Sequence, residues 1–268
     1  MSSNIKHNEI LANYCTFKIG GPADNFVVVE TEEELKEAMS MPRAMLLGNG
    51  SNILFSDKGY RGTIVKLGEG FSKIEVKGST IVAGAGALLV KVANVALENG
   101  LSGLEFACGI PGSVGGAMLM NAGAYDHSIS ELLDDKEGFG YRQSPFKTKG
   151  EIVTSAKFNL LPDDKEQIKA RMKDYTQRRT SKQPLSYPSA GSFFKRPTGY
   201  FAGKLIEDAG LKGFSVGGAQ ISSLHAGFVI NTGNATSEDV INLMHHVQET
   251  VENKFGVLLE PEVIIVEE

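Results

Sequence analysis

The chain of 268 residues has few of the features that mark specialised classes of protein. Its two cysteines, Cys15 and Cys108, form no C-x-x-C pair, so they make neither a disulfide framework nor a zinc site. Acidic residues outnumber basic ones by 32 to 27, which argues against a nucleic-acid partner. No apolar run approaches the roughly eighteen residues of a membrane helix, and the N-terminus lacks a signal-peptide segment. We therefore expect a soluble, reduced, cytoplasmic protein without a membrane partner.

Glycine, in contrast, is abundant, at 31 of 268 residues, or about 12% against a usual ~7%. The stretch 109–126, GIPGSVGGAMLMNAGAYD, holds five glycines among Ile, Val, Met and Ala. A surface linker would carry Ser, Lys and Glu instead. The many glycines therefore indicate that another group packs closely against the backbone of this stretch. The chain is also long enough for one large domain or two modest ones, with a core of real size.

Local patterns predict an α+β first half and a smaller α/β second half, joined by a polar helix over 163–182. A Thr31/Glu34 capping box opens a helix over 31–39, and Gly100 ends one over 87–99. The segments read as strands are 25–30, 44–55 (interrupted by a glycine loop), 63–67, 72–76, 79–84, 151–161, 225–233 and 257–266. Further helices are expected over 204–210 and 235–256.

Three glycine loops could serve a ligand. GAGALL (84–89) follows a strand, but Leu89 replaces the third glycine of a dinucleotide-binding fingerprint, so a tight turn is the better reading. GNGSN (48–52) and PGSVGG (111–116) offer bare amides of the kind that bind a diphosphate. Neither loop has the lysine of a Walker loop. Each alone could be an ordinary turn, whereas both together with the bend in NAGAYD favour a long ligand.

Several motifs occur in an order that resembles one family of flavoenzymes. They are TFKIGGPA (16–23), LGNGSNIL (47–54), GLEFACGIPGSVGGAMLMNAGAY (103–125), GFGYR (138–142), YPSAGSFFKRP (187–197), AGKLIEDAGLKG (202–213) and LEPEV (259–263). Together they are similar to the UDP-N-acetylenolpyruvoylglucosamine reductases of peptidoglycan synthesis. The resemblance implies an FAD-binding domain of the p-cresol methylhydroxylase/vanillyl-alcohol oxidase type over 1–165 and a substrate-binding domain over 166–268.

The resemblance also implies non-covalent FAD, NADPH as co-substrate and a UDP-sugar enolpyruvyl ether as substrate. The absence of histidine from both glycine loops fits non-covalent attachment. The amides of 109–116 would then face the FAD diphosphate, and the apolar residues would pack on the isoalloxazine. The implied FAD-binding residues are Gly48, Asn49, Gly50, Ser51, Asn52, Ile110, Pro111, Gly112, Ser113, Gly115, Gly116, Ala122 and Gly123.

Three residues match the catalytic positions of the family: Ser192, Glu262 and Arg142. Ser192 would protonate C2 of the substrate, which requires a supporting network because serine is a weak acid. Arg142 would stabilise the developing enolate, since its planar fork suits a carboxylate. Without the resemblance these would be a turn serine, a strand-end acid and a surface arginine. Tyr187, Lys195 and Arg196 are expected to hold the UDP part, or else to be solvated loop residues.

The chain departs from the family pattern in two places. Only Lys136 and Glu137 separate the segment ending at Asp135 from GFGYR, where relatives carry a longer stretch, and this shortening bears on Arg142. Ile264 stands where an arginine commonly follows PEV. The region 197–256 has no room for the substrate-capping insertion of one subclass. A related FAD-linked oxidase and a UDP-sugar-binding protein without redox activity remain the alternatives. No metal site is expected, and the oligomeric state is open.

Overall fold

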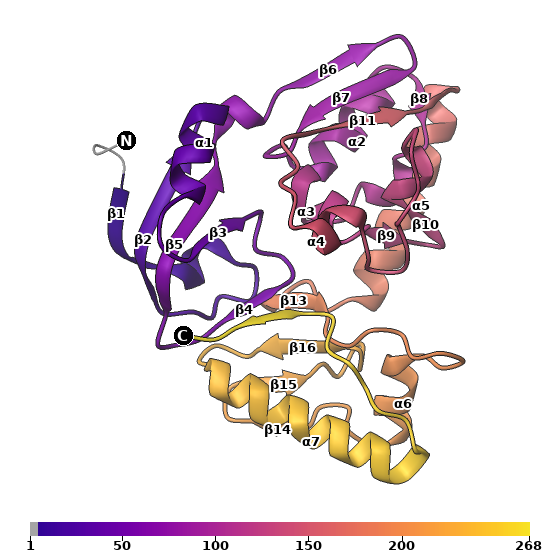
Figure 1. Cartoon of the computed structure of the whole chain (residues 1–268). Helices are drawn as coiled ribbons and strands as arrows, with labels where there is room; N and C mark the ends of the chain where they lie inside the picture. The colour runs from indigo at the N-terminus through magenta and orange to yellow at the C-terminus, as the bar shows by residue number, and fades with distance from the viewer. Residues whose placement is uncertain (1–4) are drawn as a thin grey trace. The chain divides into compact units, whose positions relative to one another are not determined.

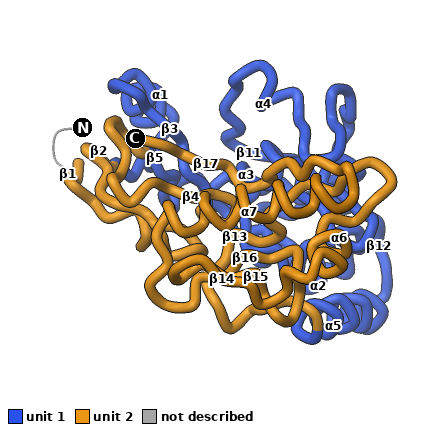
Figure 2. The backbone as a smooth tube through the Cα atoms, turned by 90° about the horizontal axis from the view of Figure 1, so that it is seen from below, with its two compact units in different colours: residues 1–4, 27–49, 65–181 blue, residues 5–26, 50–64, 182–268 orange. Residues whose placement is uncertain are grey.

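The structure, a computed structural model, describes residues 5–268. These residues form two compact units (Figure 2). Unit 1 holds residues 27–49 and 65–181, and unit 2 holds residues 5–26, 50–64 and 182–268. Each unit is therefore assembled from segments that are far apart in the sequence. No helix within residues 5–268 is long and apolar enough to cross a membrane.

Unit 1 is built around a three-stranded sheet with the order β11-β7-β6. Its strands and helices are α1 (Glu32–Met39), β3 (Ala44–Leu47), β6 (Ile74–Lys77), β7 (Thr80–Gly84), α2 (Leu89–Glu98), β8 (Leu101–Ser102), α3 (Val114–Leu119), β9 (Gly123–Ala124), β10 (His127–Ser128), α4 (Pro145–Lys149), β11 (Ser155–Asn159), β12 (Leu161–Pro162) and α5 (Lys165–Lys182). All pairings in the sheet are antiparallel, and Gly78 in the left-handed region forms the turn between β6 and β7.

Helices α2 and α3 pack near β7 and β11 (Figure 1), and together they enclose the core of unit 1. Helix α2 buries Leu89, Val92, Ala93 and Ala96, the spacing of one helical face. Phe158 and Ile81, which are opposite one another on β11 and β7, are fully buried in the same core. The apolar periodicity in the sequence thus corresponds to the side chains that hold this unit together.

Unit 2 contains a four-stranded antiparallel sheet with the order β13-β16-β15-β14. Helix α7 packs along β14 and β15 (Figure 1). The helices and strands of unit 2 are β1 (Ile5–Ile10), β4 (Ile53–Phe55), β13 (Ser189–Ser192), α6 (Ala202–Asp208), β14 (Ser215–Val216), β15 (Ala219–Ile221), β16 (Phe228–Asn231), α7 (Ser237–Phe255) and β17 (Ile264–Val266). Strand β17 pairs in parallel with β4. Strands β2 (Pro22–Val29) and β5 (Tyr60–Leu67) contribute residues to both units.

Several elements differ from the sequence-based expectation; for example, β11 covers only Ser155–Asn159 of 151–161, and β16 covers only Phe228–Asn231 of 225–233. The predicted glycine loop at 111–116 runs directly into a short helix, α3, which begins at Val114. Local propensity opposes a helix there because Gly115 and Gly116 are poor helix formers, but the Ser113 side chain caps it by accepting from the Gly116 amide. The last strand is also shorter than 257–266, because only Ile264–Val266 pair with β4.

Candidate cofactor and catalytic site

A cavity of about 160 Å³ in unit 1 brings the two glycine loops together. Residues of both loops line it together with apolar side chains from other segments. Its lining residues are Leu46, Leu47, Gly48, Asn49, Lys66, Leu67, Ala85, Gly86, Leu88, Ser113, Gly115, Gly116, Leu119, Glu151, Ile152 and Val153. Apolar walls with a few polar groups are typical of cofactor sites. The cavity therefore fits part of a ligand that combines a flat apolar ring with a polar chain.

The two loops touch at Gly48 and Ser113. A Cβ atom at Gly48 would lie 2.8 Å from the Ser113 Oγ atom, so the close approach requires glycine at this position. The neighbouring Asn49 side chain donates a hydrogen bond of 2.5 Å to the carbonyl of Pro111. The loops at 48–49 and 111–116 thus form one surface, although they are separated by about sixty residues of sequence. Their role toward FAD remains a prediction.

Most backbone amides of the second loop already have acceptors within the chain. The Ile110 amide donates to Ala107 (3.0 Å), and those of Val114 and Gly115 donate to Ala87 (2.8 Å) and Ala85 (2.9 Å). The expectation that the whole run of amides over 109–116 faces a diphosphate is therefore wrong for these three. Among residues 5–268, no acceptor takes the amides of Gly112 and Ser113. These two remain available to a ligand.

Gly50, Ser51 and Asn52, the rest of the first loop, belong to unit 2. Gly50 has a φ of 63°, and a Cβ atom there would collide with the carbonyl of Tyr14, so close backbone packing explains this glycine. The Asn52 side chain donates to the carbonyl of Glu262 at 3.1 Å. Asn52 thereby fixes the segment just before β17, which carries the predicted catalytic residue Glu262, and its contact with FAD stays a prediction.

Ala122 and Gly123 follow α3 in unit 1. The Ala122 amide donates to Ala117 at 2.8 Å, and Gly123 pairs with Ser128 in the β9–β10 hairpin. Neither residue lines the cavity, and neither do Ile110, Pro111 or Gly112. The contact of these five residues with FAD therefore remains a prediction.

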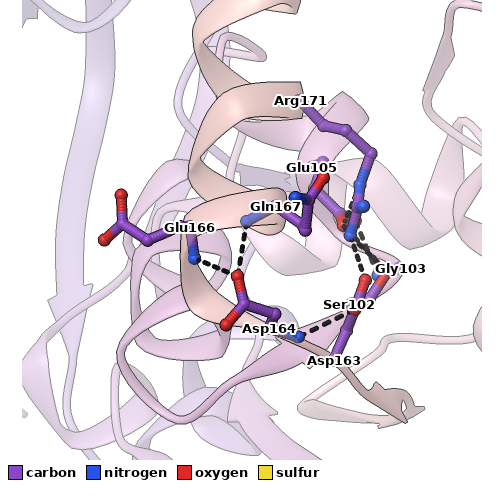
Figure 3. A network of polar contacts seen from close by, with 8 residues as sticks. All are labelled: Ser102, Gly103, Glu105, Asp163, Asp164, Glu166, Gln167 and Arg171. Atoms are coloured by element: carbon purple, nitrogen blue, oxygen red, sulfur yellow. Dashed lines mark hydrogen bonds and ion pairs between the residues drawn. The ribbon is translucent and has the colours of Figure 1, made fainter.

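An ionic network around the buried Glu105 side chain supports the start of the glycine-rich segment (Figure 3). The Glu105 side chain accepts hydrogen bonds from the Gly103 amide (2.6 Å), the Ser102 hydroxyl (2.8 Å) and Arg171 of α5 (2.8 Å). Burial favours the neutral acid, but these donors outweigh it and hold the pKa of Glu105 below its usual value. Glu105 therefore stays ionised and ties the segment before Gly109 to α5.

Ser192 and Glu262 lie on adjoining backbone segments of unit 2. Ser192 ends β13 at a register shift, with Gly191 in the left-handed region (φ 81°), and its side chain is exposed. The Glu262 amide donates to the carbonyl of Phe193 at 2.8 Å, so the two predicted catalytic residues are held in register. Phe193 and Phe194 are almost fully buried. Both rings belong to the hydrophobic core of unit 2 and anchor the loop that follows Ser192.

Arg142 belongs to unit 1 and occupies an unusual backbone conformation. It lies in a tight turn in which Gly140 and Gln143 exchange hydrogen bonds of 3.1 and 3.2 Å, and its φ is 56°. A left-handed conformation costs a non-glycine residue roughly 1–2 kcal/mol. Such strain is concentrated at functional sites. The guanidinium carbon lies 5.1 Å from the centre of the Tyr141 ring.

The three residues predicted to hold the UDP part lie on the surface of unit 2. Tyr187 is exposed, and the Lys195 ammonium pairs with Glu260 at 3.0 Å. The Arg196 guanidinium stacks over the exposed Phe201 ring at 4.0 Å. These residues flank the Ser192 loop in the chain, as the sequence indicated, and their contacts with substrate remain a prediction.

A second hollow in unit 1, of about 490 Å³, lies beside α5 and is lined by Tyr125, Asp126, Gln167, Ala170, Arg171, Asp174, Tyr175 and Arg178. Its arginines already pair with acids, because Arg171 contacts Glu105 and Arg178 contacts Asp174. It contains none of the glycine-loop residues. These arginine pairings and its lining distinguish this larger hollow from the cavity at the two glycine loops. Within residues 5–268, no cluster of His, Cys, Asp and Glu is arranged to bind a metal.

Lys66, Ile152 and Val153 line the cavity although no sequence motif indicated them. Lys66 is the one charged residue in the apolar run TIVKL, and that exception was its available signal. In the structure its ammonium donates to the carbonyl of Gly48 at 2.9 Å. Burial lowers the pKa of Lys66.

Comparisons with known proteins agree with the motif resemblance. Residues 23–136 match an FAD-binding domain, and residues 183–266 match the C-terminal domain of UDP-N-acetylenolpyruvoylglucosamine reductase. The reductase of Clostridium beijerinckii is 50% identical over 284 aligned residues, covering 98% of this chain and 93% of that protein. The reductase of Caldanaerobacter subterraneus subsp. tengcongensis is 49% identical, with coverages of 97% and 93%.

A solved structure gives the same answer for the fold. The crystal structure of the reductase from Thermus caldophilus is 39% identical to this chain and superposes with a TM-score of 0.86. The aligned region covers 97% of this chain and 98% of the Thermus caldophilus chain. The expected α+β fold, with an FAD-binding domain followed by a C-terminal domain, is confirmed. The chain belongs to the UDP-N-acetylenolpyruvoylglucosamine reductase family.

Proposed function

We propose that this protein is an FAD-containing reductase that uses NADPH to convert UDP-N-acetylglucosamine enolpyruvate into UDP-N-acetylmuramate for peptidoglycan synthesis. Family membership over nearly the whole chain supports this activity. The observation that carries the proposal in the structure is the junction of the two glycine loops at one cavity with apolar walls. We assign FAD binding to the region 1–165 and substrate binding to 166–268. The site of action is the cytoplasm, where NADPH is available.

When bound, FAD supplies hydride transfer from NADPH to C3 of the enolpyruvyl group. The chain must then supply position, charge and one proton. Ser192 donates the proton to C2; its exposed position at the end of β13, next to the segment that carries Glu262, supports this role. Glu262 is the second catalytic residue. Arg142 binds the substrate carboxylate and stabilises the charge that develops as C3 is reduced.

Tyr187, Lys195 and Arg196 bind the UDP part of the substrate. Lys195 and Arg196 supply positive charge for a diphosphate, and Tyr187 supplies a phenol for a hydrogen bond to the sugar. Their exposed positions on one loop of unit 2 support this assignment. Lys195 would have to break its ion pair with Glu260 to bind the diphosphate.

The test is to follow each half-reaction on purified, flavin-containing protein without oxygen. We expect a yellow protein that loses flavin on heating, consistent with non-covalent binding. NADPH should bleach the flavin absorbance, and UDP-N-acetylglucosamine enolpyruvate should restore it. Protein that binds the UDP-sugar but no flavin would support a binding protein instead. Restoration of colour by oxygen but not by the enolpyruvyl substrate would support an oxidase.

A further inference from the structure

Lys66 lies at the end of β5 and forms part of the cavity wall in unit 1. It is half-buried, and its ammonium donates a hydrogen bond of 2.9 Å to the carbonyl of Gly48. Gly48 is the first residue of a loop predicted to contact FAD. The lysine therefore joins the cavity and the loop, although 18 residues separate it from Gly48 in the sequence.

The positive charge of Lys66 has no anionic partner in the described part of the chain. No carboxylate of residues 5–268 lies within ion-pair distance of its ammonium, and the carbonyl of Gly48 is its one hydrogen-bond acceptor. Glu151 is exposed and lines the same cavity, but it forms no ion pair with Lys66. A cation removed from water is costly unless an anion compensates it. The cavity thus favours a negatively charged ligand.

The remaining polar groups of the cavity agree with an anion at this place. Ser113 lines the cavity and has an amide without an acceptor among residues 5–268. Asn49 and Lys66 both contact the backbone where the two loops meet, through Pro111 and Gly48. Lys66 is the single lysine among the lining residues, and they include no arginine. The charge that both glycine loops lack is supplied by a neighbouring strand.

We propose that Lys66 binds the diphosphate of FAD, with the Ser113 amide, at the junction of the two glycine loops. This inference rests on the proposed function, because it assumes that FAD occupies the cavity of unit 1. The apolar side chains of Leu67, Ile152 and Val153, which also line the cavity, then suit a ring of the same cofactor. Lys66 acts on cofactor affinity and takes no part in the chemistry.

The first experiment measures the dissociation constant of FAD by equilibrium dialysis of the holoenzyme at several KCl concentrations. Lys66→Met should weaken FAD binding about ten- to hundredfold, the range for losing a charge-assisted contact. Its affinity should also depend less on salt than that of the wild type. Lys66→Arg should retain most of the affinity. Lys77→Met is the matched control, because this lysine of unit 1 is 66% exposed and pairs with Glu75, and it should bind FAD normally.

The second experiment separates a diphosphate contact from simple support of Gly48. ADP and adenosine are used to displace FAD from the wild type and the variants. The wild type should bind ADP more tightly than adenosine, and Lys66→Met should lose most of that difference. An equal loss for both ligands would overturn the proposal, because it would assign Lys66 a purely structural role. Lys66→Gln, which keeps a donor but not the charge, repeats the test if the methionine variant folds poorly.

These outcomes are distinct from failure of the proposed function. If the wild type binds no FAD under any condition, the proposed function is wrong and this inference falls with it. If the wild type binds FAD and Lys66→Met binds it equally well at low salt, only the assignment of Lys66 is overturned.

Discussion

Replacement of Glu105 by glutamine tests the support of the glycine-rich segment. Glu105 is 6% exposed and accepts from Gly103, Ser102 and Arg171. Glutamine keeps the shape but loses the charge, and its NH₂ group cannot accept a hydrogen bond. At least one hydrogen bond to a charged group is then lost, which is worth about 1.5–3 kcal/mol. Arg171 is 40% exposed and retains Asp163, so we expect a loss near 2 kcal/mol rather than the larger cost of a stranded charge.

The assay is urea unfolding of the FAD-saturated protein, followed by far-ultraviolet circular dichroism at pH 7. Asp174→Asn is the matched control, because Asp174 pairs with Arg178 of the same helix and both side chains are more than half exposed. The free energy of unfolding of this control should change by less than about 0.5 kcal/mol. A Glu105→Gln variant as stable as the wild type would refute the reasoning.

The same variant makes a prediction about pH. The pKa of Glu105 is lowered in the folded protein, because its hydrogen bonds outweigh the effect of burial. Its stabilising contribution is therefore complete above the unfolded value of about 4.3 and is lost as the pH falls through the folded pKa. The difference in unfolding free energy between wild type and Glu105→Gln should shrink below about pH 4. A difference that stays constant or grows on acidification would show that the charge is not the cause.

Three further variants test the assigned site. Gly115→Asp should weaken FAD binding at least about tenfold, since its Cβ atom would lie 3.0 Å from that of Ala85 and add a negative charge to the cavity; unchanged flavin content would contradict this. Arg142→Lys should slow flavin reoxidation by substrate about tenfold or more because the planar fork is lost; normal turnover would make Arg142 a surface residue. Ser192→Ala should leave flavin reduction by NADPH intact and slow reoxidation by the ~10²–10⁴-fold of a lost general acid, with Ser192→Cys less affected. Rapid-mixing absorbance measures both steps, and equal slowing of both would indicate a disrupted site.

Elements with local signals could be predicted from the sequence. Helix α7 begins at a Thr236/Asp239 capping box and ends at Gly256, which has a φ of 68°. Apolar spacing and a C-terminal glycine likewise defined α2. These signals lie within a few residues of the structure that they specify, so a single sequence contains all the necessary information.

The site depends on contacts that the sequence pattern does not encode. The hydrogen bond from Asn52 to Glu262 joins residues 210 positions apart, and Lys66 reaches Gly48 from another strand. Helix α3 forms against its own glycine content, because the Val114 and Gly115 amides find acceptors at Ala87 and Ala85. Motif resemblance located the loops, but tertiary packing decides which amides remain open to a ligand.

The measurement that tests the central claim most directly is NADPH oxidation by the flavin-containing protein with and without UDP-N-acetylglucosamine enolpyruvate. We expect steady oxidation to depend on the enolpyruvyl substrate, and one UDP-N-acetylmuramate to appear for each NADPH consumed. NADPH oxidation that is unaffected by the substrate, or that proceeds without formation of UDP-N-acetylmuramate, would contradict it.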